Sequence, residues 1–291
     1  ESVAIAQNRV MEKNFIKDAG LPVAPFAVIN EASDLPDDLS LLYPAILKVA
    51  RFGYDGKGQA RVKNQAEAQQ AFIEFKQEVC VLEQMLPLDL EVSVILARDA
   101  TGHVEAFQTA ENSHLNGILD ISIAPARCSE VIKANARELA KKLAEKLNYV
   151  GVLGVEFFLV GKQLLVNEIA PRPHNSGHYT IDACVTNQFE QQVRVLAGLP
   201  LGDARLHSKA VMVNILGDSW FAGTKILREK DTPLEPLWNK AFRHANLKLH
   251  LYGKHEPRKG RKMGHFTVLG EDAQAVLNAA LVARSELHIG E

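Results

Sequence analysis

The densest group of chemically active side chains follows an apolar segment, in the sequence LLVNEIAPRPHNSGH that begins at Leu164. Glu168 stands near the end of the apolar part, and two prolines then exclude a helix, because proline lacks a backbone donor and fixes φ. The polar side chains that follow are Arg172, His174, Asn175, Ser176 and His178. Polar loops at strand ends often bind or catalyse, so this segment predicts a functional site, with a polar surface turn as the alternative.

A second acid, Glu156, interrupts the apolar segment 151–160 just upstream. A short turn at 161–163 joins the two apolar segments, which predicts a β-hairpin. Side chains alternate between the faces of a strand, so Glu156 and Glu168 can project from one side of that hairpin. Two neighbouring acids repel each other unless a cation lies between them, and carboxylate oxygens suit a Mg²⁺ ion that also holds nucleotide phosphates. The hairpin therefore predicts a metal site, with a pair of surface acids as the alternative.

A lysine within an apolar strand precedes a glycine-rich loop, in the sequence AILKVARFGYDGKGQARV. Lys48 lies in the predicted strand 45–49, where a buried lysine needs an anionic partner. Gly53, Gly56 and Gly58 follow, and backbone N–H groups in such a loop can cup phosphate oxygens. The loop lacks the Gly-Lys-Ser/Thr ending of a Walker A loop and returns to a strand. It predicts a phosphate clamp or a plain hairpin.

Three further places carry candidate side chains. Glu83 ends the predicted strand 79–84, where it can accept hydrogen bonds from ribose hydroxyls or simply face water. His114 stands in a polar loop predicted over 111–117, and a lone loop histidine is more often a surface residue. The segment 253–265 gathers five cations in a tight turn: Lys254, Arg258, Lys259, Arg261 and Lys262. Such a turn suits a phosphomonoester, with a solvated basic turn as the alternative.

Regular elements are predicted to position these side chains. Asn8 caps a helix over 9–19, in which Arg9 and Lys13 share a face that is by default solvated. Apolar stripes predict further helices over 66–77, 129–147, 188–196 and 271–286. Alternation predicts strands over 59–62, 88–99, 104–110, 118–124, 210–216, 247–252 and 266–269. In one helix three apolar side chains are either core or a subunit contact: Phe189, Val193 and Leu196.

Length and composition exclude several classes of protein. With 291 residues, 47% of them hydrophobic and 23% charged, the chain can bury a sizeable core in two or more lobes. A net charge of -2 gives no overall field that would attract nucleic acid. No apolar run reaches the length of a membrane span, and the first residues lack the features of a signal peptide. The scattered cysteines predict reduced thiols of a cytoplasmic protein: Cys80, Cys128 and Cys184.

The order of these motifs resembles the ATP-grasp superfamily, in which two α+β lobes hold ATP between them. RPHNSGH after NEIAP, AILKVARFGYDGKGQ, and YGK followed by PRKGRKMGH resemble the family of ATP-dependent N5-carboxyaminoimidazole ribonucleotide synthetases. The resemblance spans nearly the whole chain, although nothing here matches the N-terminal βαβ domain of that family. It implies an α+β ATP-grasp fold with a small lid lobe over 1–83, a large lobe over 84–205, and a small C-terminal β-rich segment with a closing helix over 206–291.

The resemblance also implies an activity in purine biosynthesis. Bicarbonate would attack the γ-phosphate of ATP to give carboxyphosphate and ADP, and the exocyclic amine of aminoimidazole ribonucleotide would then be carboxylated. ATP and Mg²⁺ are the implied cofactors, and a homodimer without nucleic-acid or membrane partners is the implied assembly. Two alternatives remain: another ATP-grasp ligase, such as formate-dependent glycinamide ribonucleotide transformylase, and a nucleotide-binding core that is inactive without the N-terminal domain.

Individual residues receive roles from the same resemblance. Those implied to contact ATP are Arg9, Lys48, Gly53, Tyr54, Asp55, Gly56, Lys57, Gly58, Gln59, Glu83, Gln84, Met85, Leu86, Glu91, His114, Asn167 and Glu168. Those implied to bind Mg²⁺ are Glu156 and Glu168. Those implied to contact bicarbonate or the ribonucleotide are Tyr54, Lys57, Arg172, His174, Asn175, Ser176, Lys254, Arg261 and Lys262. The implied catalytic residues are Lys48, Arg172, His174 and Asn175.

Overall fold

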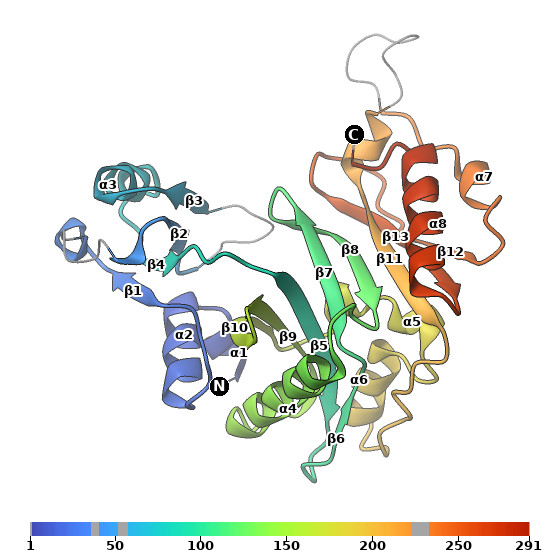
Figure 1. Ribbon diagram of the computed structural model, residues 1–291, viewed down its shortest axis with the longest axis horizontal. Coiled ribbons are helices and arrows are strands. Elements are labelled where there is room, and N and C mark those ends of the chain that lie inside the picture. The colour runs from blue at the N-terminus through green and yellow to red at the C-terminus, as the bar shows by residue number, and fades with distance from the viewer. Residues whose placement is uncertain (1, 36–40, 52–57, 223–232, 291) are drawn as a thin grey trace.

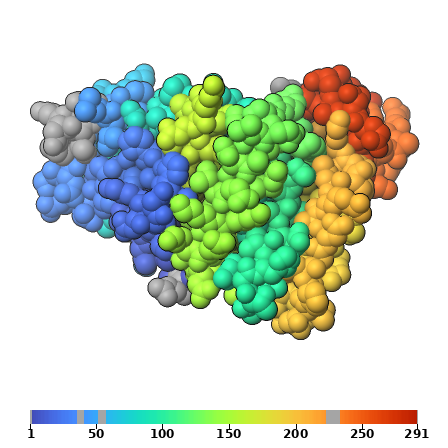
Figure 2. Space-filling view, turned by 60° about the horizontal axis from the view of Figure 1, so that its bottom comes forward, coloured from blue at the N-terminus to red at the C-terminus, as the bar shows by residue number. Residues whose placement is uncertain are grey.

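Two antiparallel sheets and the helices that cover them build the molecule. A computed structural model describes residues 2–35, 41–51, 58–222 and 233–290. The small sheet lies at the N-terminal end of the molecule and the C-terminal helix at the opposite end (Figure 1). The space-filling view shows the N-terminal segment packed directly against the middle of the chain (Figure 2). The arrangement is the α+β architecture that the sequence predicts.

The small sheet has the strand order β1-β4-β2-β3. Its strands are β1 Phe26–Ile29, β2 Ala45–Val49, β3 Gln59–Val62 and β4 Cys80–Gln84. Leu47 and Leu82 are paired across β2 and β4, and both are completely buried together with Phe72 of α3 (Gln65–Glu74). This small core leaves the residues that alternate with Leu47, including Lys48, on the other face of β2.

The large sheet has nine strands in the order β10-β9-β5-β7-β8-β11-β13-β12, with β6 paired to β5. Its strands are β5 Leu90–Arg98, β6 Val104–Ala106, β7 Ala110–Leu115, β8 Ile118–Ala124, β9 Gly151–Val160, β10 Gln163–Ala170, β11 Lys209–Leu216, β12 Leu247–Leu251 and β13 Lys262–Gly270. The strands nearest the C-terminus therefore continue the same sheet as the hairpin β9-β10.

Helices cover both faces of the large sheet, so every residue of strand β5 from Val92 to Ala97 is buried. Val94 and Leu96 pack in the core beneath α4, whereas Ile95 and Ala97 pack in the core on the opposite face. The α-helices are α1 Ser2–Ala6, α2 Arg9–Asp18, α4 Glu130–Lys146, α5 Thr180–Ala183, α6 Gln188–Leu196, α7 Trp238–Ala241 and α8 Ala273–Glu286. Short 3-10 helices are Ala32–Asp34, Asn175–Gly177 and Gly217–Trp220. Within the described ranges, no helix has the length and apolar character needed to cross a bilayer.

Three predicted elements differ from the structure. His114 lies in strand β7 and not in a loop, because β7 pairs with β5 on one side and β8 on the other, and that pairing outweighs the polar local sequence. The strand predicted over 104–110 is broken into β6 and the start of β7. Strand β13 begins at Lys262, so the basic turn ends earlier than the sequence predicts.

Helix α2 offers a direct test of the fold, because one side chain caps its N-terminus. Oδ1 of Asn8 accepts hydrogen bonds from the N–H groups of Val10 at 3.0 Å and Met11 at 3.3 Å. We expect Asn8→Ala to lower the free energy of unfolding by about 1 kcal/mol, seen as a lower urea midpoint. Asn8→Asp keeps an acceptor and should retain most of that stability. Equal losses in the two variants would contradict the capping role.

Candidate active site

A cleft of about 980 Å³ lies between the two sheets. Its walls come from α2, from β2 and β3 of the small sheet, from β5, β7, β9 and β10 of the large sheet, and from the polar loop after β10. The predicted site residues that line it are Arg9, Lys48, Gln59, Met85, Leu86, Glu91, His114, Glu156, Asn167, Glu168, Arg172, His174, Asn175 and Lys262. Side chains from all the predicted motifs therefore meet in one place.

The two acids of the hairpin face each other across β9 and β10. Glu156 and Glu168 are cross-strand partners, so both side chains lie on one face of the hairpin, as predicted. A bulge is the reason: the register shifts between Val166 and Glu168, which leaves Asn167 as the extra residue. Without that extra residue Glu168 would pair with Val155 and point to the opposite face. Burial and the charge of Glu168 raise the pKa of Glu156, while the Asn167 amide donates to its Oε2 at 3.3 Å.

Glu83 is enclosed by two lysines instead of lining the cleft. It is 2% exposed, its Oε1 accepts from Nζ of Lys48 at 2.7 Å, and its Oε2 pairs with Nζ of Lys13. Burial alone would raise the pKa of Glu83, but the two ammonium groups lower it to about 2. Burial lowers the pKa of Lys48, which Glu83 partly offsets. Glu83 is thus the anionic partner that a buried lysine needs, and the structure does not place it where a ribose would bind.

Helix α2 connects this buried group to the hairpin. Lys13 reaches Glu83 on β4, while Oε1 of Glu12 accepts from the backbone N–H of Ile169 on β10 at 2.5 Å. Arg9, one turn earlier, lies 3.8 Å from Glu168. The default expectation of a solvated basic face is wrong for Lys13, which is only 1% exposed. Burial and the nearby Glu168 raise the pKa of Glu12 to about 8.

A histidine and a glutamate pair beside the hairpin. Nδ1 of His114 lies 2.7 Å from Oε2 of Glu91, on the adjacent strand β5. Burial disfavours the charged imidazole, but the hydrogen bond to Glu91 and the charges of Glu91 and Glu156 outweigh it and raise the pKa of His114. Both side chains line the cleft.

A hydrogen bond to strand β5 holds the polar loop after β10 against the large sheet. Nδ1 of His174 accepts from the Ser176 N–H and lies 2.9 Å from its Oγ, which bonds to Oγ of Ser93 at 2.8 Å. Nε2 of His174 lies 3.6 Å from Oε1 of Glu156. Burial, with the charges of Arg172 and Lys262, lowers the pKa of His174 to about 3. His174 is therefore neutral, and its Nε2–H is the group it presents to the acids.

The other predicted residues fall outside the cleft lining. Ser176 is completely buried beneath His174, and the Gln84 amide donates to the backbone of Leu41 at 3.1 Å. Lys254 and Arg261 donate to backbone carbonyls of their own turn, at 2.6 and 2.7 Å. Gly58 precedes β3 without lining the cleft. Five lid residues lie outside the described part of the chain: Gly53, Tyr54, Asp55, Gly56 and Lys57.

Sequence reasoning missed several lining residues. Ile46 lies two residues before Lys48 and therefore on the same face of β2. Phe158 lies two residues after Glu156 and on the same face of β9. Period-two alternation from the predicted residues therefore points to both. For the remaining lining residues the sequence offers no such pattern: Arg61, Leu88, Asn116, Gly117 and Leu119.

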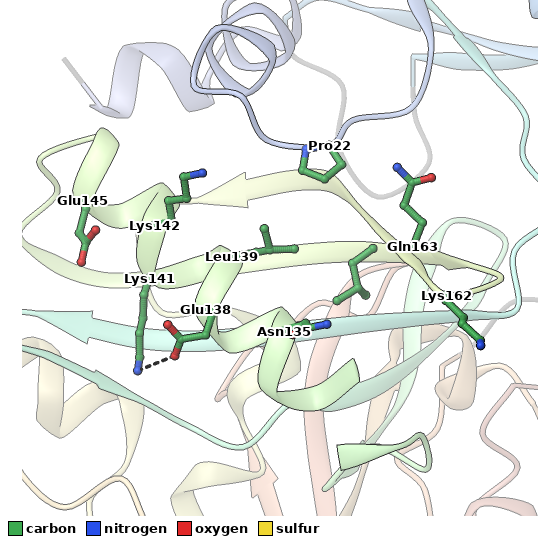
Figure 3. A pocket seen from close by; sticks show the side chains of 10 residues that line it. Pro22, Asn135, Glu138, Leu139, Lys141, Lys142, Glu145, Lys162 and Gln163 are labelled. Carbon is green, nitrogen blue, oxygen red and sulfur yellow. Dashed lines mark hydrogen bonds and ion pairs between the residues drawn. The ribbon is translucent and has the colours of Figure 1, made fainter. Parts of the chain in front are cut away.

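A second hollow of about 710 Å³ lies on the outer side of α4 (Figure 3). It is bordered by the turn of the hairpin, by Pro22 and by the exposed face of the helix, where Glu138 pairs with Lys141 at 3.0 Å. It shares no lining residue with the cleft. Its charged groups are those of an ordinary solvated helix face, so the chemistry is assigned to the cleft.

Comparison with known proteins agrees with this geometry. The family described as the ATP-grasp domain matches residues 14–189, and the phosphoribosylaminoimidazole carboxylase C-terminal domain matches residues 210–279. The N5-carboxyaminoimidazole ribonucleotide synthase of Bacillus subtilis is 46% identical over 271 residues, which cover 92% of this chain and 68% of that protein. The chain belongs to this family of ATP-grasp enzymes. The Brucella melitensis synthase is 44% identical over 91% of this chain and 70% of that protein.

Solved structures of synthases have the same fold. The Staphylococcus aureus synthetase complexed with ADP superposes with a TM-score of 0.84 at 36% identity, over 96% of this chain and 71% of that chain. The Aspergillus clavatus synthase, in complex with ADP and 5-aminoimidazole ribonucleotide, gives 0.86 at 27% identity, over 99% and 74%. The predicted ATP-grasp fold is confirmed.

The buried ion pairs of Glu83 can be tested by their contribution to the stability of the protein. We expect Glu83→Gln to lower the free energy of unfolding by about 3–5 kcal/mol, because it leaves Lys13 and Lys48 buried without an anion. Glu105→Gln, which loses only the surface pair with His103, should cost less than about 1 kcal/mol. Urea midpoints of the two variants measure the difference.

The stability difference between the wild type and Glu83→Gln should depend on pH in a defined way. The pKa of Glu83 is lowered from 4.5 to about 2, so its ion pairs contribute their full stability above about pH 4.5 and lose it as the pH falls toward 2. The stability gap between wild type and Glu83→Gln should therefore narrow below pH 4.5. A gap that stays constant down to pH 3 would contradict the ion-paired state.

Proposed function

We propose that this chain binds Mg-ATP between its two sheets and uses it to carboxylate 5-aminoimidazole ribonucleotide with bicarbonate. The products are N5-carboxyaminoimidazole ribonucleotide, ADP and phosphate. The carrying observation is that the paired acids Glu156 and Glu168 share one cleft with Lys48 and with the polar loop. The family is one of ATP-dependent carboxylating ligases of purine biosynthesis. The proposal includes a cytoplasmic location, which suits the three free cysteines.

The nucleotide end of the cleft is its small-sheet side. Lys48 and Arg9 offer positive charge to phosphate oxygens, and Ile46 and Phe158 offer apolar surface to a base. The N–H groups of Gln84 and Met85 already donate to backbone carbonyls at 2.9 and 2.8 Å. An adenine edge would therefore meet the remaining backbone groups up to Leu86. The Glu91-His114 pair supplies hydrogen-bonding groups for ribose hydroxyls.

Glu156 and Glu168 are the residues that would hold Mg²⁺. A magnesium ion keeps several waters and phosphate oxygens as ligands, so it needs only one or two protein carboxylates. Among the described residues no group of three or more His, Cys, Asp or Glu side chains could hold a metal, which agrees with such a sparse site. Burial and the charge of Glu168 raise the pKa of Glu156, and a cation would relieve the repulsion between the two acids. When bound, the ion would neutralise phosphate charge.

The polar loop is the acceptor end. Arg172 and Lys48 approach the cleft from opposite sheets and would stabilise charge on the transferring phosphoryl group. Neutral His174 presents Nε2–H, so it serves as a hydrogen-bond donor that orients the reactants together with Asn175. Lys262 is the cation of the basic turn that lines the cleft, where it would meet the 5'-phosphate. Water exclusion matters here because carboxyphosphate is short-lived in water.

ADP formation tests the substrate assignment. We expect Mg-ATP and bicarbonate to give slow ADP release that 5-aminoimidazole ribonucleotide stimulates. Stimulation by glycinamide ribonucleotide and formate instead would move the chain to the transformylases. Binding of Mg-ATP without stimulation by either pair would support the alternative of a nucleotide-binding core.

The proposed role of Glu168 as a Mg²⁺ ligand can be tested by calorimetry. Glu168→Ala should weaken Mg-ATP binding about tenfold or more, which corresponds to about 1.4 kcal/mol for a lost ligand. Glu145→Ala, an exposed acid on α4, is the matched control and should bind as wild type. Unchanged affinity in Glu168→Ala would remove this residue from the site.

A homodimer through α6 is a further part of the proposal. Phe189, Val193 and Leu196 are 42%, 61% and 77% exposed, so the alternative that they are core residues is wrong for the single chain. Val185 and Leu199, which precede and follow this helix in the sequence, are also half exposed. Exposed apolar side chains at this spacing on one face of a helix favour a protein interface, and a second copy of the chain is the partner that the family resemblance implies.

The dimer proposal predicts a change in mass on disrupting that patch. Leu196→Glu places a charge in the centre of the interface and should convert dimer to monomer in sedimentation velocity. Val131→Glu changes an apolar side chain of α4 that is 68% exposed, and it should leave the dimer intact. A monomeric wild type, or a dimer that survives Leu196→Glu, would contradict the proposed interface.

A further inference from the structure

Three histidines and a tyrosine form a cluster behind the polar loop. His178 ends the loop and packs on His265 of β13, with ring centroids 4.9 Å apart. His265 in turn stacks on His250 of β12 at 4.6 Å, and its Nδ1 lies 2.9 Å from the hydroxyl of Tyr252. Three of these residues belong to motifs picked out in the sequence to which the reaction gives no role: the end of NSGH, the tyrosine of YGK and the end of KMGH.

Gln188 joins this cluster to the active-site loop. It is the first residue of α6 and is completely buried. Its Oε1 accepts from the N–H of His174 at 2.8 Å, and its Nε2 donates to the C=O of His174 at 2.8 Å. The same Nε2 lies 3.0 Å from Nδ1 of His178. Gly177 allows this approach, because a Cβ there would lie 2.7 Å from Oε1 of Gln188.

The backbone contacts decide which way the Gln188 amide points. Its oxygen must face the N–H of His174 and its NH₂ must face the C=O, since the reverse would oppose like groups. The second amide hydrogen therefore points at Nδ1 of His178, which must accept it. His178 is thus neutral and carries its proton on Nε2, because a protonated Nδ1 would face another donor.

The far side of the cluster is attached to the strand that carries Lys262. His265 is three residues beyond Lys262 on β13, and Tyr252 directly follows β12. Nε2 of His250 lies 2.8 Å from Asp182 of α5. A continuous set of contacts therefore runs from His174, through Gln188 and the cluster, to the strand that presents Lys262 to the cleft.

We propose that Gln188 and His178 are positioning residues that hold His174 at a fixed place relative to Lys262, through a hydrogen bond that requires neutral His178. This rests on the proposed function, in which His174 and Lys262 contact opposite ends of one ribonucleotide. Two contacts so far apart act together only if their spacing is set before the substrate arrives.

The surroundings of His178 favour its neutral form. Cationic Lys262 on β13, His250 on β12 and Arg172 in the same loop surround it, while Asp182 is engaged by His250. Phe189 of α6 covers the ring, with centroids 5.5 Å apart. Burial and these positive groups lower the pKa of His178 to about 4.

Gln188→Glu tests the proposal. Glutamate keeps the acceptor for the N–H of His174 but draws a proton onto Nδ1 of His178 and repels the C=O of His174. We expect the KM for 5-aminoimidazole ribonucleotide to lie about tenfold above that of the wild type at pH 8, where two acceptors face each other at His178, the worth of one lost hydrogen bond. It should fall toward the wild-type value at pH 6, where protonated Nδ1 donates to the carboxylate, with the KM for ATP unchanged at both pH values. In the wild type the KM for the ribonucleotide should be flat over this range.

The same helix supplies a matched control. Gln191 is equally buried and also bonds both ways to a backbone, accepting from the N–H of Gly202 at 2.9 Å and donating to its C=O at 2.7 Å. Gln191→Glu imposes the same structural cost without a histidine partner and should give no pH-dependent KM. If Gln188→Glu and Gln191→Glu behave alike, the role of Gln188 is merely structural and the proposal fails.

Histidine ¹⁵N NMR separates this proposal from the proposed function. In the wild type, His178 should show an unprotonated Nδ1 from pH 8 to pH 6, and in Gln188→Glu both nitrogens should be protonated at pH 6. A protonated Nδ1 in the wild type would overturn the network whatever the substrate is. Absence of ribonucleotide-dependent ADP formation in a wild type with the expected NMR signature would instead sink the substrate assignment and, with it, the positioning role.

Tyr252→Phe is the mildest variant, so a change in its kinetics is not a consequence of misfolding. It keeps the ring and removes only the hydroxyl that meets His265. The KM for the ribonucleotide should rise severalfold while kcat and the KM for ATP stay unchanged. His244→Gln, which changes a histidine paired with Glu286 away from the cluster, should have no effect. An effect of Tyr252→Phe on ATP alone would contradict the assignment.

Discussion

Repulsion between two carboxylates is the constraint around which this site is built. Glu156 and Glu168 face each other only because one extra residue, Asn167, shifts the register of an otherwise regular hairpin. The bulge costs local pairing, and the charge of Glu168 adds to the effect of burial in raising the pKa of Glu156, so a cation beside the pair would be favourable. Mg²⁺ with nucleotide phosphates is the ligand that we propose for this pair, because it supplies the matching charge.

Helix α2 connects that hairpin to the other sheet through two neighbouring buried side chains. Consecutive residues serve opposite lobes, because Glu12 bonds to the backbone of β10 and Lys13 pairs with Glu83 on β4. Glu83 also holds Lys48, so this lysine of the small sheet and the strand that carries Glu168 are both held in place through the same helix. The spacing of the cleft therefore depends on buried ion pairs, whose geometry tolerates little displacement.

Local patterns were enough to predict the hairpin and the helices of nine residues or more, and the family resemblance named many of the residues that meet in the cleft. They were not enough for features that depend on distant partners. Alternation alone does not place Glu168 on the face of Glu156, since the bulge at Asn167 has no local signal. The burial of Lys13 follows from Glu83, seventy residues away, and the strand at His114 follows from its pairing with β5. Tertiary contacts decide such positions and override local propensity.

A crystal structure of the chain with Mg²⁺ and ADP would test the central claim most directly. We expect a magnesium ion with one oxygen each of Glu156 and Glu168 at about 2.1 Å, and with the diphosphate beside Lys48. A metal held by other acids, with Glu156 and Glu168 left facing each other and the nucleotide bound elsewhere, would contradict it.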